Sequence, residues 1–315
     1  VSIALLAIAI HNLGVEAISF TGSQVGIVTD TFHTKAKIVS IMGNRIREEL
    51  KKGKIVIVAG FQGVTGEDDI TTLGRGGSDL SAVAIAKALC ADECEIYTDV
   101  EGVYTTDPRI EPKAKKIEKI SYDEMLEMAS LGAKVMQARS IEFAKNYDVV
   151  IHVRSSFSDA PGTIICKEAK NMEKVAVSGV ALQKNEAKLT IRNVPDKPGI
   201  AAKIFKQIAD NNVNVDMIVQ NISNTGMTDI SFTVVKEDIT RARKVLAKVA
   251  RSLGVGEVLE DDNIAKISVV GVGMRSHTGV ASKMFAALAS KKINIKMIST
   301  SEIKISCVID KKHGE

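Results

Sequence analysis

The chain has 315 residues, with 42 basic and 38 acidic side chains and a formal net charge of +4. Apolar residues make up 45% of the chain and charged residues 25%, which is usual for a globular protein and excludes a disordered or fibrous one. The small net charge and an aromatic content of 4%, without tryptophan, argue against a nucleic-acid-binding protein. The length is sufficient for two or three domains.

The first ten residues, Val1–Ile10, are nearly all apolar. This run is too short to cross a membrane, and no cationic segment precedes it as in a signal peptide, so we expect no membrane partner. We expect instead a helix of the protein core whose preceding segment is missing, because the chain does not begin with methionine.

The first half of the chain alternates helix and strand patterns. Apolar side chains recur every four residues from Ile38 to Leu50, and a basic pair precedes Gly53, so a helix is predicted over Ala36–Lys52. The other elements expected here are strands at Lys54–Phe61, Glu95–Thr98 and Asp148–Val153, and helices at Ser81–Leu89, after the capping box of Ser121 and Glu124, and at Ala133–Asn146. Such alternation indicates an α/β domain with a mostly parallel sheet covered by helices.

The four cysteines are too few for a disulfide framework in a chain of this length. Cys90 and Cys94 are separated by three residues and have no histidine cluster near them in sequence, which argues against a zinc site. We therefore expect a cytoplasmic protein with buried, reduced thiols at Cys90, Cys94, Cys166 and Cys307.

The second half contains an internal repeat. Lys203-Ile204-Phe205 recurs as Lys283-Met284-Phe285, 80 residues later, and Asn214–Ile218 recurs as Asn294–Ile298. Each copy is predicted to form a strand, a glycine turn, an amphipathic helix and two further strands. A unit this small cannot bury both faces of its sheet, so the copies are expected to pack together or against a partner. The second copy stops at Glu315, before the last helix of the first copy, and is expected to be incomplete.

A polar, turn-containing stretch separates the two halves near Asn171. The predicted organisation is a first domain at residues 1–171, a linker and strand at 172–184, a first repeat at 185–262 and a second repeat at 263–315. The pattern of the apolar strand Val175–Leu182 allows pairing with either copy.

The most informative local motif is TTLGRGGSD, which joins a strand to a helix that begins near Ser78. Its glycines allow close approach of the backbone, and the start of a helix offers free N–H groups to an anion. The planar Arg75 guanidinium suits a carboxylate or a phosphate, and Asp79 lies in the first helical turn. A surface loop with a helix cap is the alternative, and the motif alone does not decide between them.

A second polar motif, YTDVEGVYTTDPR, begins at the carboxyl end of a strand, where open α/β sheets bind their ligands. Asp99 and Asp107 supply carboxylates, and Arg109 supplies a second guanidinium. A long surface turn set by Asp107-Pro108 is the alternative. Together the two motifs favour a site for a phosphorylated ligand, and we expect Arg75 and Arg109 to converge on one pocket.

Several long motifs resemble those of the aspartokinase family, namely TTLGRGGSD, YTDVEGVYTTDPR, EMLEMASLGAKV, VPDKPGIAAKIF and ISTSEIKISCVI. The resemblance extends over the whole chain. It implies an α/β fold in which an amino-acid-kinase-like α/β/α sandwich, truncated at its N-terminus, is followed by two βαββαβ ACT modules. The first module would be inserted in the second, so that the strand Val175–Leu182 would belong to the second module.

The resemblance also implies a reaction, the transfer of the γ-phosphoryl group of Mg-ATP to the side-chain carboxylate of L-aspartate. The product is 4-phospho-L-aspartate, from which lysine, threonine and methionine are made. Arg75, binding the α-carboxylate, and Asp79, organising the reacting end, would be the catalytic residues. The implied aspartate pocket contains Phe61, Arg75, Gly76, Gly77 and Ser78. The implied ATP site contains Thr98, Asp99, Tyr104, Asp107, Arg109, Lys134 and Val135. No protein side chain is implied as a metal ligand, because Mg²⁺ is carried by ATP.

In similar proteins the ACT pair binds a feedback amino acid and forms a homodimer. Lysine, threonine or both are implied as the effector here. The implied effector residues are Asp196, Gly199, Ala201, Gln220, Asn221, Asn294, Ile295, Ser301 and Glu302. Backbone groups at a helix start can hold the carboxylate of such an effector, and an acidic side chain can meet its ammonium group.

Family members begin with a K-F-G-G-[ST]-S segment that holds the phosphates and with a glutamate that binds substrate, and neither is present before Val1. We therefore expect the chain as given to be catalytically incomplete, either as a fragment or because disordered residues were omitted. The alternative function is a non-catalytic ACT-containing subunit that senses amino acids. The presence of Arg75, Asp79 and Asp107 favours the enzyme.

Overall fold

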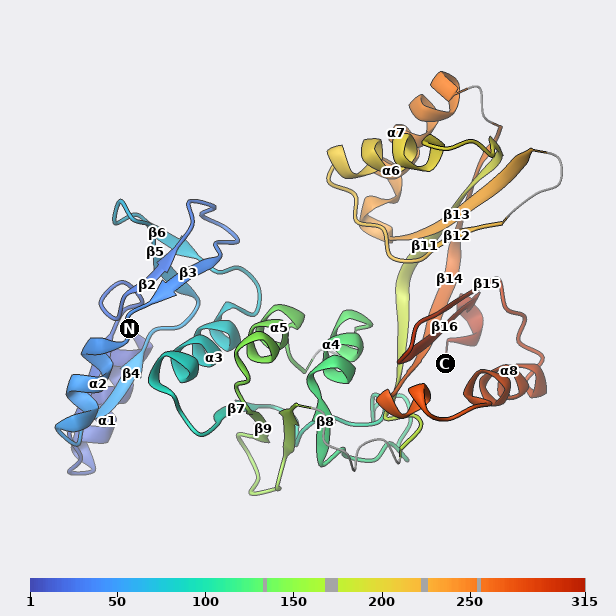
Figure 1. Cartoon of the computed structure of the whole chain (residues 1–315). Coiled ribbons are helices and arrows are strands. Elements are labelled where there is room, and N and C mark those ends of the chain that lie inside the picture. The colour runs from blue at the N-terminus through green and yellow to red at the C-terminus, as the bar shows by residue number, and fades with distance from the viewer. Residues whose placement is uncertain (133–134, 168–174, 222–225, 254–255, 315) are drawn as a thin grey trace. The chain divides into compact units, whose positions relative to one another are not determined.

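The computed structural model of the protein describes residues 1–132, 135–167, 175–221, 226–253 and 256–314. The chain divides into two compact units, Val1–Lys174 and Val175–Glu315, which are described separately below (Figure 1). Within the described ranges, no helix combines the length and the apolar character that crossing a membrane requires.

The first unit contains helices and strands in mixed order. Its helices are α1 (Ser2–Asn12), α2 (Asn44–Lys51), α3 (Gly77–Leu89), α4 (Tyr122–Ser130) and α5 (Ala138–Tyr147). Its strands are β1 (Ala17–Phe20), β2 (Ile27–Thr29), β3 (Ile38–Ile41), β4 (Ile55–Val58), β5 (Gln62–Val64), β6 (Ile70–Thr72), β7 (Cys94–Thr98), β8 (Lys119–Ser121), β9 (Ile151–Ser155) and β10 (Thr163–Cys166).

The strands of the first unit form a parallel pair, β1-β4, and two four-stranded sheets, β7-β9-β10-β8 and β3-β2-β5-β6. The pairs β7–β9 and β10–β8 are parallel, whereas β9–β10 is antiparallel. The sheets are thus less uniformly parallel than expected, because the short segment between β9 and β10 cannot form the long crossover that parallel strands need. Figure 1 shows α3, α5 and α4 side by side over the sheet that contains β7, β9 and β8.

The structure corrects the predicted helix over Ala36–Lys52. Only Asn44–Lys51 is helical, and Ile38–Ile41 forms β3, which pairs with β2. Gly43 separates the two with a φ of 63°, a conformation that a right-handed helix does not contain. A spacing of four residues places side chains on one face of a strand as well as of a helix, so the pattern could not distinguish them.

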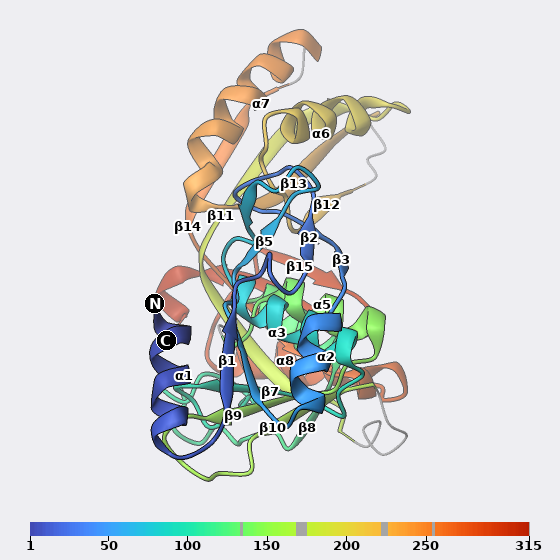
Figure 2. The ribbon, with the colours of Figure 1, turned by 90° about the vertical axis from the view of Figure 1, so that its left-hand side faces the viewer.

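Two further expectations concern burial. All of the run Val1–Ile10 except Val1, the N-cap, lies within α1 as expected, but none of the residues of α1 is buried, and Leu5 is 62% exposed. The helix contacts β1 and β4 (Figure 2), and no described element covers its outer face, so it is not a core helix of this chain. Cys94 and Cys307 are buried as expected, whereas Cys166 is only half-buried and Cys90, the C-cap residue of α3, is exposed.

The predicted capping box is confirmed at the start of α4. Glu124 donates its backbone N–H to the Ser121 hydroxyl, and the Glu124 carboxylate accepts the backbone N–H of Ser121. Both residues are buried, so these bonds satisfy donors at the helix start that water does not reach.

The second unit is one antiparallel sheet with the strand order β12-β13-β11-β14-β16-β15. Its strands are β11 (Gly179–Pro195), β12 (Ile218–Gln220), β13 (Met227–Val235), β14 (Val258–Val270), β15 (Met297–Thr300) and β16 (Lys304–Asp310). Its helices are α6 (Ile200–Asp210), α7 (Ile239–Leu253) and α8 (Val280–Ser290), with short 3-10 turns η2 (Lys236–Asp238), η3 (Val272–Arg275) and η4 (Lys311–His313). Helix α8 begins 80 residues after α6, as the repeat predicts.

The two central strands, β11 and β14, each take part in both repeats (Figure 1). The start of β11, Gly179–Gln183, pairs with Lys266–Val270 of the second repeat, and Lys188–Ile191 pairs with Val258–Asp261. Two shifts of register separate these stretches. Each repeat has its own apolar cluster, one against α6 and α7 and the other against α8.

A buried ion network lies at the register shifts. The Lys266 ammonium is 2.7 Å from the Glu186 carboxylate and also bonds to Asp216. The side chains of Lys266 and Glu186 are only 1% and 5% exposed. Glu186 and Lys266 stand 80 residues apart, at equivalent positions of the two repeats, so opposite charges meet where the repeats join. A buried charge is tolerated only with such a partner.

Candidate functional site

The TTLGRGGSD motif forms the loop between β6 and α3. Gly74 and Gly76 have φ values of 80° and 74°, and a Cβ at Gly76 would overlap Cγ of Gln137, so this position accepts only glycine without rearrangement. Arg75 is exposed, and it forms no hydrogen bond or ion pair with any other described residue. We call Leu73–Gly76 the glycine loop below.

Phe61 lies against this loop in a strained conformation. Its φ is 72°, which is uncommon for a residue with a side chain, and its backbone N–H donates to the Ser81 hydroxyl at 3.0 Å. Its carbonyl accepts the Leu73 N–H at 2.9 Å, and its ring packs where a Cβ of Gly77 would stand. The predicted aspartate-pocket residues Phe61, Gly76 and Gly77 therefore meet at the start of α3.

Asp79 lies in the first turn of α3 and is half-buried. Burial raises the pKa of its carboxyl, and a hydrogen bond from the backbone N–H of Gln137 acts in the opposite direction. The carboxylate thus lies near the backbone of Gln137, the N-cap residue of α5. Ser78, beside it, is exposed, and its Cα is close to Gly60.

The second motif follows β7, as predicted. The Thr98 hydroxyl donates to Asp99 at 3.2 Å, and Tyr104 forms an isolated bridge with Lys116. Arg109 donates from Nε and Nη2 to the two oxygens of Asp107, at 3.0 and 2.8 Å, and its side chain is 84% exposed. That carboxylate accordingly raises the pKa of Arg109.

Two predictions about the ATP site stay open. Lys134 lies outside the described residues, and its neighbour Val135 is half-buried. No contact between described residues joins Arg75 to Arg109, so their convergence on one pocket stays a prediction.

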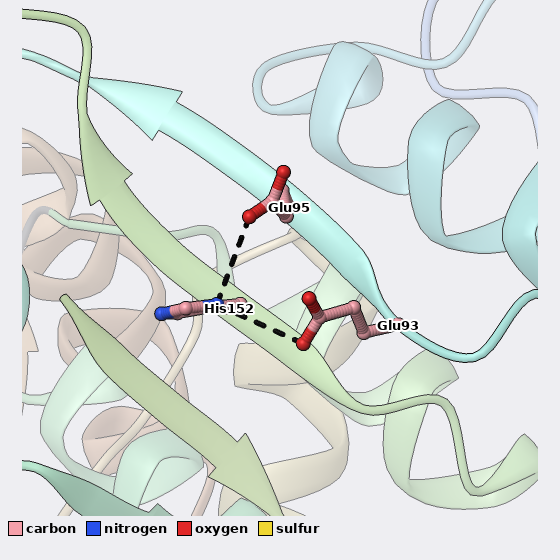
Figure 3. A group of neighbouring side chains, drawn as sticks. All are labelled: Glu93, Glu95 and His152. Atoms are coloured by element: carbon pink, nitrogen blue, oxygen red, sulfur yellow. Dashed lines mark ion pairs between the residues drawn. The ribbon is translucent and has the colours of Figure 1, made fainter. Parts of the chain in front are cut away.

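No motif in the sequence indicated one cluster of the first unit, which is formed by Glu93, Glu95 and His152 (Figure 3). The Nδ1 atom of His152 lies 3.7 Å from Glu93 and 3.8 Å from Glu95. Glu95 is also held by Arg154 at 2.8 Å and by the Tyr97 hydroxyl at 3.0 Å, and these two bonds lower its pKa. Glu95 thus already has a cationic and a hydroxyl partner, whereas Glu93 has His152 as its only partner among the described residues, and Arg154 and Tyr97 account for the position of Glu95 without a metal ion.

Each repeat carries an open pocket at the start of its first helix. The pocket of the first repeat, about 340 Å³, is lined by Asp196, Gly199, Ala201 and Gln220 together with neighbouring residues at the start of α6. The pocket of the second repeat, about 590 Å³, lies at the start of α8 and is lined by Arg275, His277, Gly279, Ser301 and Glu302, among others. Gly199 and Gly279 hold equivalent positions 80 residues apart, each with a positive φ.

The predicted effector residues are therefore divided between two pockets. Asp196, Gly199, Ala201 and Gln220 share the first, and Ser301 and Glu302 share the second. Three line neither: Asn221, whose carbonyl accepts the Thr228 hydroxyl, Asn294, which is exposed, and Ile295, which packs against the core of the second repeat.

Comparisons with known proteins extend over both units. Residues 1–155 match the amino acid kinase family, and residues 192–249 and 267–315 match the ACT domain. The aspartokinase of Pseudomonas aeruginosa is 56% identical over 317 residues, which cover 100% of this chain and 77% of that protein. This chain belongs to the aspartokinase family.

Two solved structures of aspartokinase III from E. coli are similar to this aspartokinase-family chain. The complex with aspartate and ADP (R-state) has a TM-score of 0.81 at 29% identity, covering 99% of this chain and 70% of that one. The complex with lysine and aspartate (T-state) has a TM-score of 0.76 at 27% identity, covering 96% and 68%. These similarities agree with the expected fold, an amino acid kinase domain followed by ACT modules.

Sequence reasoning missed the residues of this aspartokinase-family chain that attach the glycine loop to α5. Gln137 and Arg139 belong to no motif that carries chemistry, and they stand more than 60 residues from the loop. It also missed Arg275 and His277 in the second pocket. Comparison of the repeats could have indicated them, because they stand 80 residues after Pro195 and Lys197 of the first pocket.

Proposed function

We propose that this protein is an aspartate kinase that transfers the γ-phosphoryl group of ATP to the side-chain carboxylate of L-aspartate. The observation that carries the proposal is the 56% identity to an aspartokinase over the whole chain. The similar E. coli enzyme that binds aspartate and ADP supports it. The match of the first unit to the amino acid kinase family weighs against a non-catalytic amino-acid sensor.

In this proposal the glycine loop and the start of α3 bind aspartate. Arg75 is exposed and has no partner among the described residues, so its guanidinium is available to the α-carboxylate. Phe61, Gly76, Gly77 and Ser78 shape the pocket, and Asp79 orients the reacting end. Tight packing of Phe61 against Gly77 supports a site of fixed shape, and phosphoryl transfer depends chiefly on such positioning.

ATP is proposed to bind at the motif after β7. Arg109 and Asp107 are an exposed ion pair, and such pairs contribute about 1 kcal/mol or less, so a polyphosphate can replace the carboxylate on the guanidinium. The other proposed ATP residues are Thr98, Asp99, Tyr104, Lys134 and Val135. Mg²⁺ would enter with the nucleotide and neutralise the charge of the phosphates.

The test is trapping of the acyl phosphate. The full-length gene product, incubated with Mg-ATP, L-aspartate and hydroxylamine, should form aspartyl hydroxamate. Arg75→Ala should reduce kcat/KM for aspartate by about 100-fold, because a charge-assisted bond to a carboxylate is lost. Arg45→Ala is the control, because Arg45 is an exposed arginine of the same unit that stacks on Phe20. Hydroxamate formation no higher than in a reaction without enzyme would rule out the proposal.

We further propose that the ACT modules bind a feedback amino acid, lysine, threonine or both, and that the protein is a cytoplasmic homodimer. The E. coli relative that binds lysine supports regulation of this kind. Asp196, Gly199, Ala201, Gln220 and Asn221 would contribute from the first repeat, and Asn294, Ile295, Ser301 and Glu302 from the second. Calorimetry with each amino acid separately, and light scattering for the dimer, test these statements. Heat from neither amino acid would exclude both effectors.

A further inference from the structure

The first turn of α5 is attached to both ends of the glycine loop. At one end, Nη1 of Arg139 donates to the carbonyl oxygen of Leu73 at 2.8 Å. At the other end, the Gln137 side chain packs against Gly76. Figure 1 shows α5 beside α3. The loop is therefore held by a helix that follows it by some 60 residues.

Arg139 also reaches a second backbone segment. Its Nη2 donates to the carbonyl oxygen of Ala36. The segment that ends at Ala36 runs beside the residue that precedes the loop. The Ala36 N–H donates to the Thr72 carbonyl at 2.9 Å, and the Thr72 N–H donates to the His33 carbonyl at 2.8 Å. The Arg139 guanidinium thus joins this segment to Leu73, the first residue of the glycine loop.

A lysine could not replace this contact fully. Ala36 and Leu73 are buried, at 0% and 1% exposure, so their carbonyl oxygens depend on protein donors. A guanidinium presents several N–H groups in a fixed plane and binds two carbonyls at once, whereas an ammonium is a compact point charge. Loss of the guanidinium leaves a buried acceptor unsatisfied on each of the two segments.

Arg75 itself has no partner among the described residues, so the backbone of the glycine loop fixes its Cα and thereby the region that its guanidinium can reach. We infer that Arg139 is a positioning residue for aspartate binding, which acts by holding this loop so that Arg75 meets the α-carboxylate. The inference rests on the proposed function. Arg139 belongs to neither the aspartate pocket nor the ATP site. Because it holds the loop that carries Arg75, its substitution should affect the use of aspartate and not of ATP.

The experiment compares Arg139→Ala and Arg139→Lys with Arg47→Ala in the full-length gene product. Arg47 is a matched control, because it is also half-buried and donates to a carbonyl of α3, that of Ala88, at the opposite end of the helix. Arg139→Ala should raise KM for aspartate about tenfold and KM for ATP less than about twofold. Arg139→Lys should lie between the wild type and Arg139→Ala, and Arg47→Ala should leave both KM values near the wild type.

Amide hydrogen exchange supplies a readout that does not depend on activity. Peptides that cover the glycine loop should exchange faster in Arg139→Ala than in the wild type, and should be unchanged in Arg47→Ala. The inference is overturned if Arg139→Ala affects aspartate KM or loop exchange no more than Arg47→Ala does, or raises both KM values equally. A wild-type protein that forms no hydroxamate removes the proposed function, and the inference with it. An active wild type with a normal Arg139→Ala variant removes the inference alone.

Discussion

Substitution of Lys266 by methionine should strongly destabilise the second unit. It leaves Glu186 charged and nearly inaccessible to water, with its second oxygen already lacking a hydrogen-bond partner. Asp216, the other partner, is 44% exposed and can be hydrated. The cost therefore comes mainly from one carboxylate, and breaking a buried pair in this way costs about 3–5 kcal/mol.

That loss corresponds to a fall in melting temperature of about 10 °C for a unit of this size. Calorimetry of the purified protein should show it in the transition of the second unit, and amide exchange in β14 should locate it there. Lys206→Met is the control, because Lys206 pairs with Asp210 on the surface of α6, with 71% and 50% exposure. An exposed pair of this kind contributes less than about 0.5 kcal/mol.

A double variant separates loss of charge pairing from loss of packing. In Lys266→Met combined with Glu186→Leu, no unpaired charge is left in the interior, so most of the lost stability should return. The reasoning is refuted if Lys266→Met is no more harmful than Lys206→Met. It is equally refuted if the double variant melts as low as Lys266→Met alone.

Three further predictions concern the first unit. Ser121→Ala removes a buried capping box and should lower the free energy of unfolding by about 1–2 kcal/mol in urea titration, and an unchanged midpoint would contradict this. Burial raises the pKa of the Cys94 thiol to about 11, so at pH 8 iodoacetamide should modify the exposed Cys90 much faster, as mass spectrometry can measure. Gly76→Ala should cost at least about 1 kcal/mol because of its positive φ, and more because its Cβ overlaps Gln137. Adding Gln137→Ala should recover part of that loss, and no recovery would show that overlap is unimportant.

The sequence predicted elements well where a local signal was sufficient. The capping box at Ser121 involves neighbours three residues apart, and the repeat fixed the starts of α6 and α8 without knowledge of the sheet. It failed at Ile38–Ile41, where the identity of a strand depends on pairing with β2. The prediction that α1 is buried was wrong for a similar reason, since the apolar character of a helix does not show what covers it.

The candidate site shows the same division between local and distant information. The motifs around Arg75 and Arg109 could be located because they are continuous in sequence and follow strands. The bonds of Arg139 to Leu73 and Ala36 could not, because they join segments that only the folded chain brings together. Nor could the sequence predict that the Arg109 guanidinium donates two hydrogen bonds to the Asp107 carboxylate, since an acidic residue two positions away can adopt many other conformations.

The strands shared by the two repeats impose an order on synthesis. Gly179–Gln183 leaves the ribosome before the first repeat, and its partner, Lys266–Val270, leaves after it. A nascent chain that ends near residue 255 therefore contains a strand without its partner strand, and such unpaired strand edges promote aggregation. The second module can be completed only after the first has folded and brought these distant segments together. Expression of the two repeats as separate polypeptides would therefore not give two independent domains.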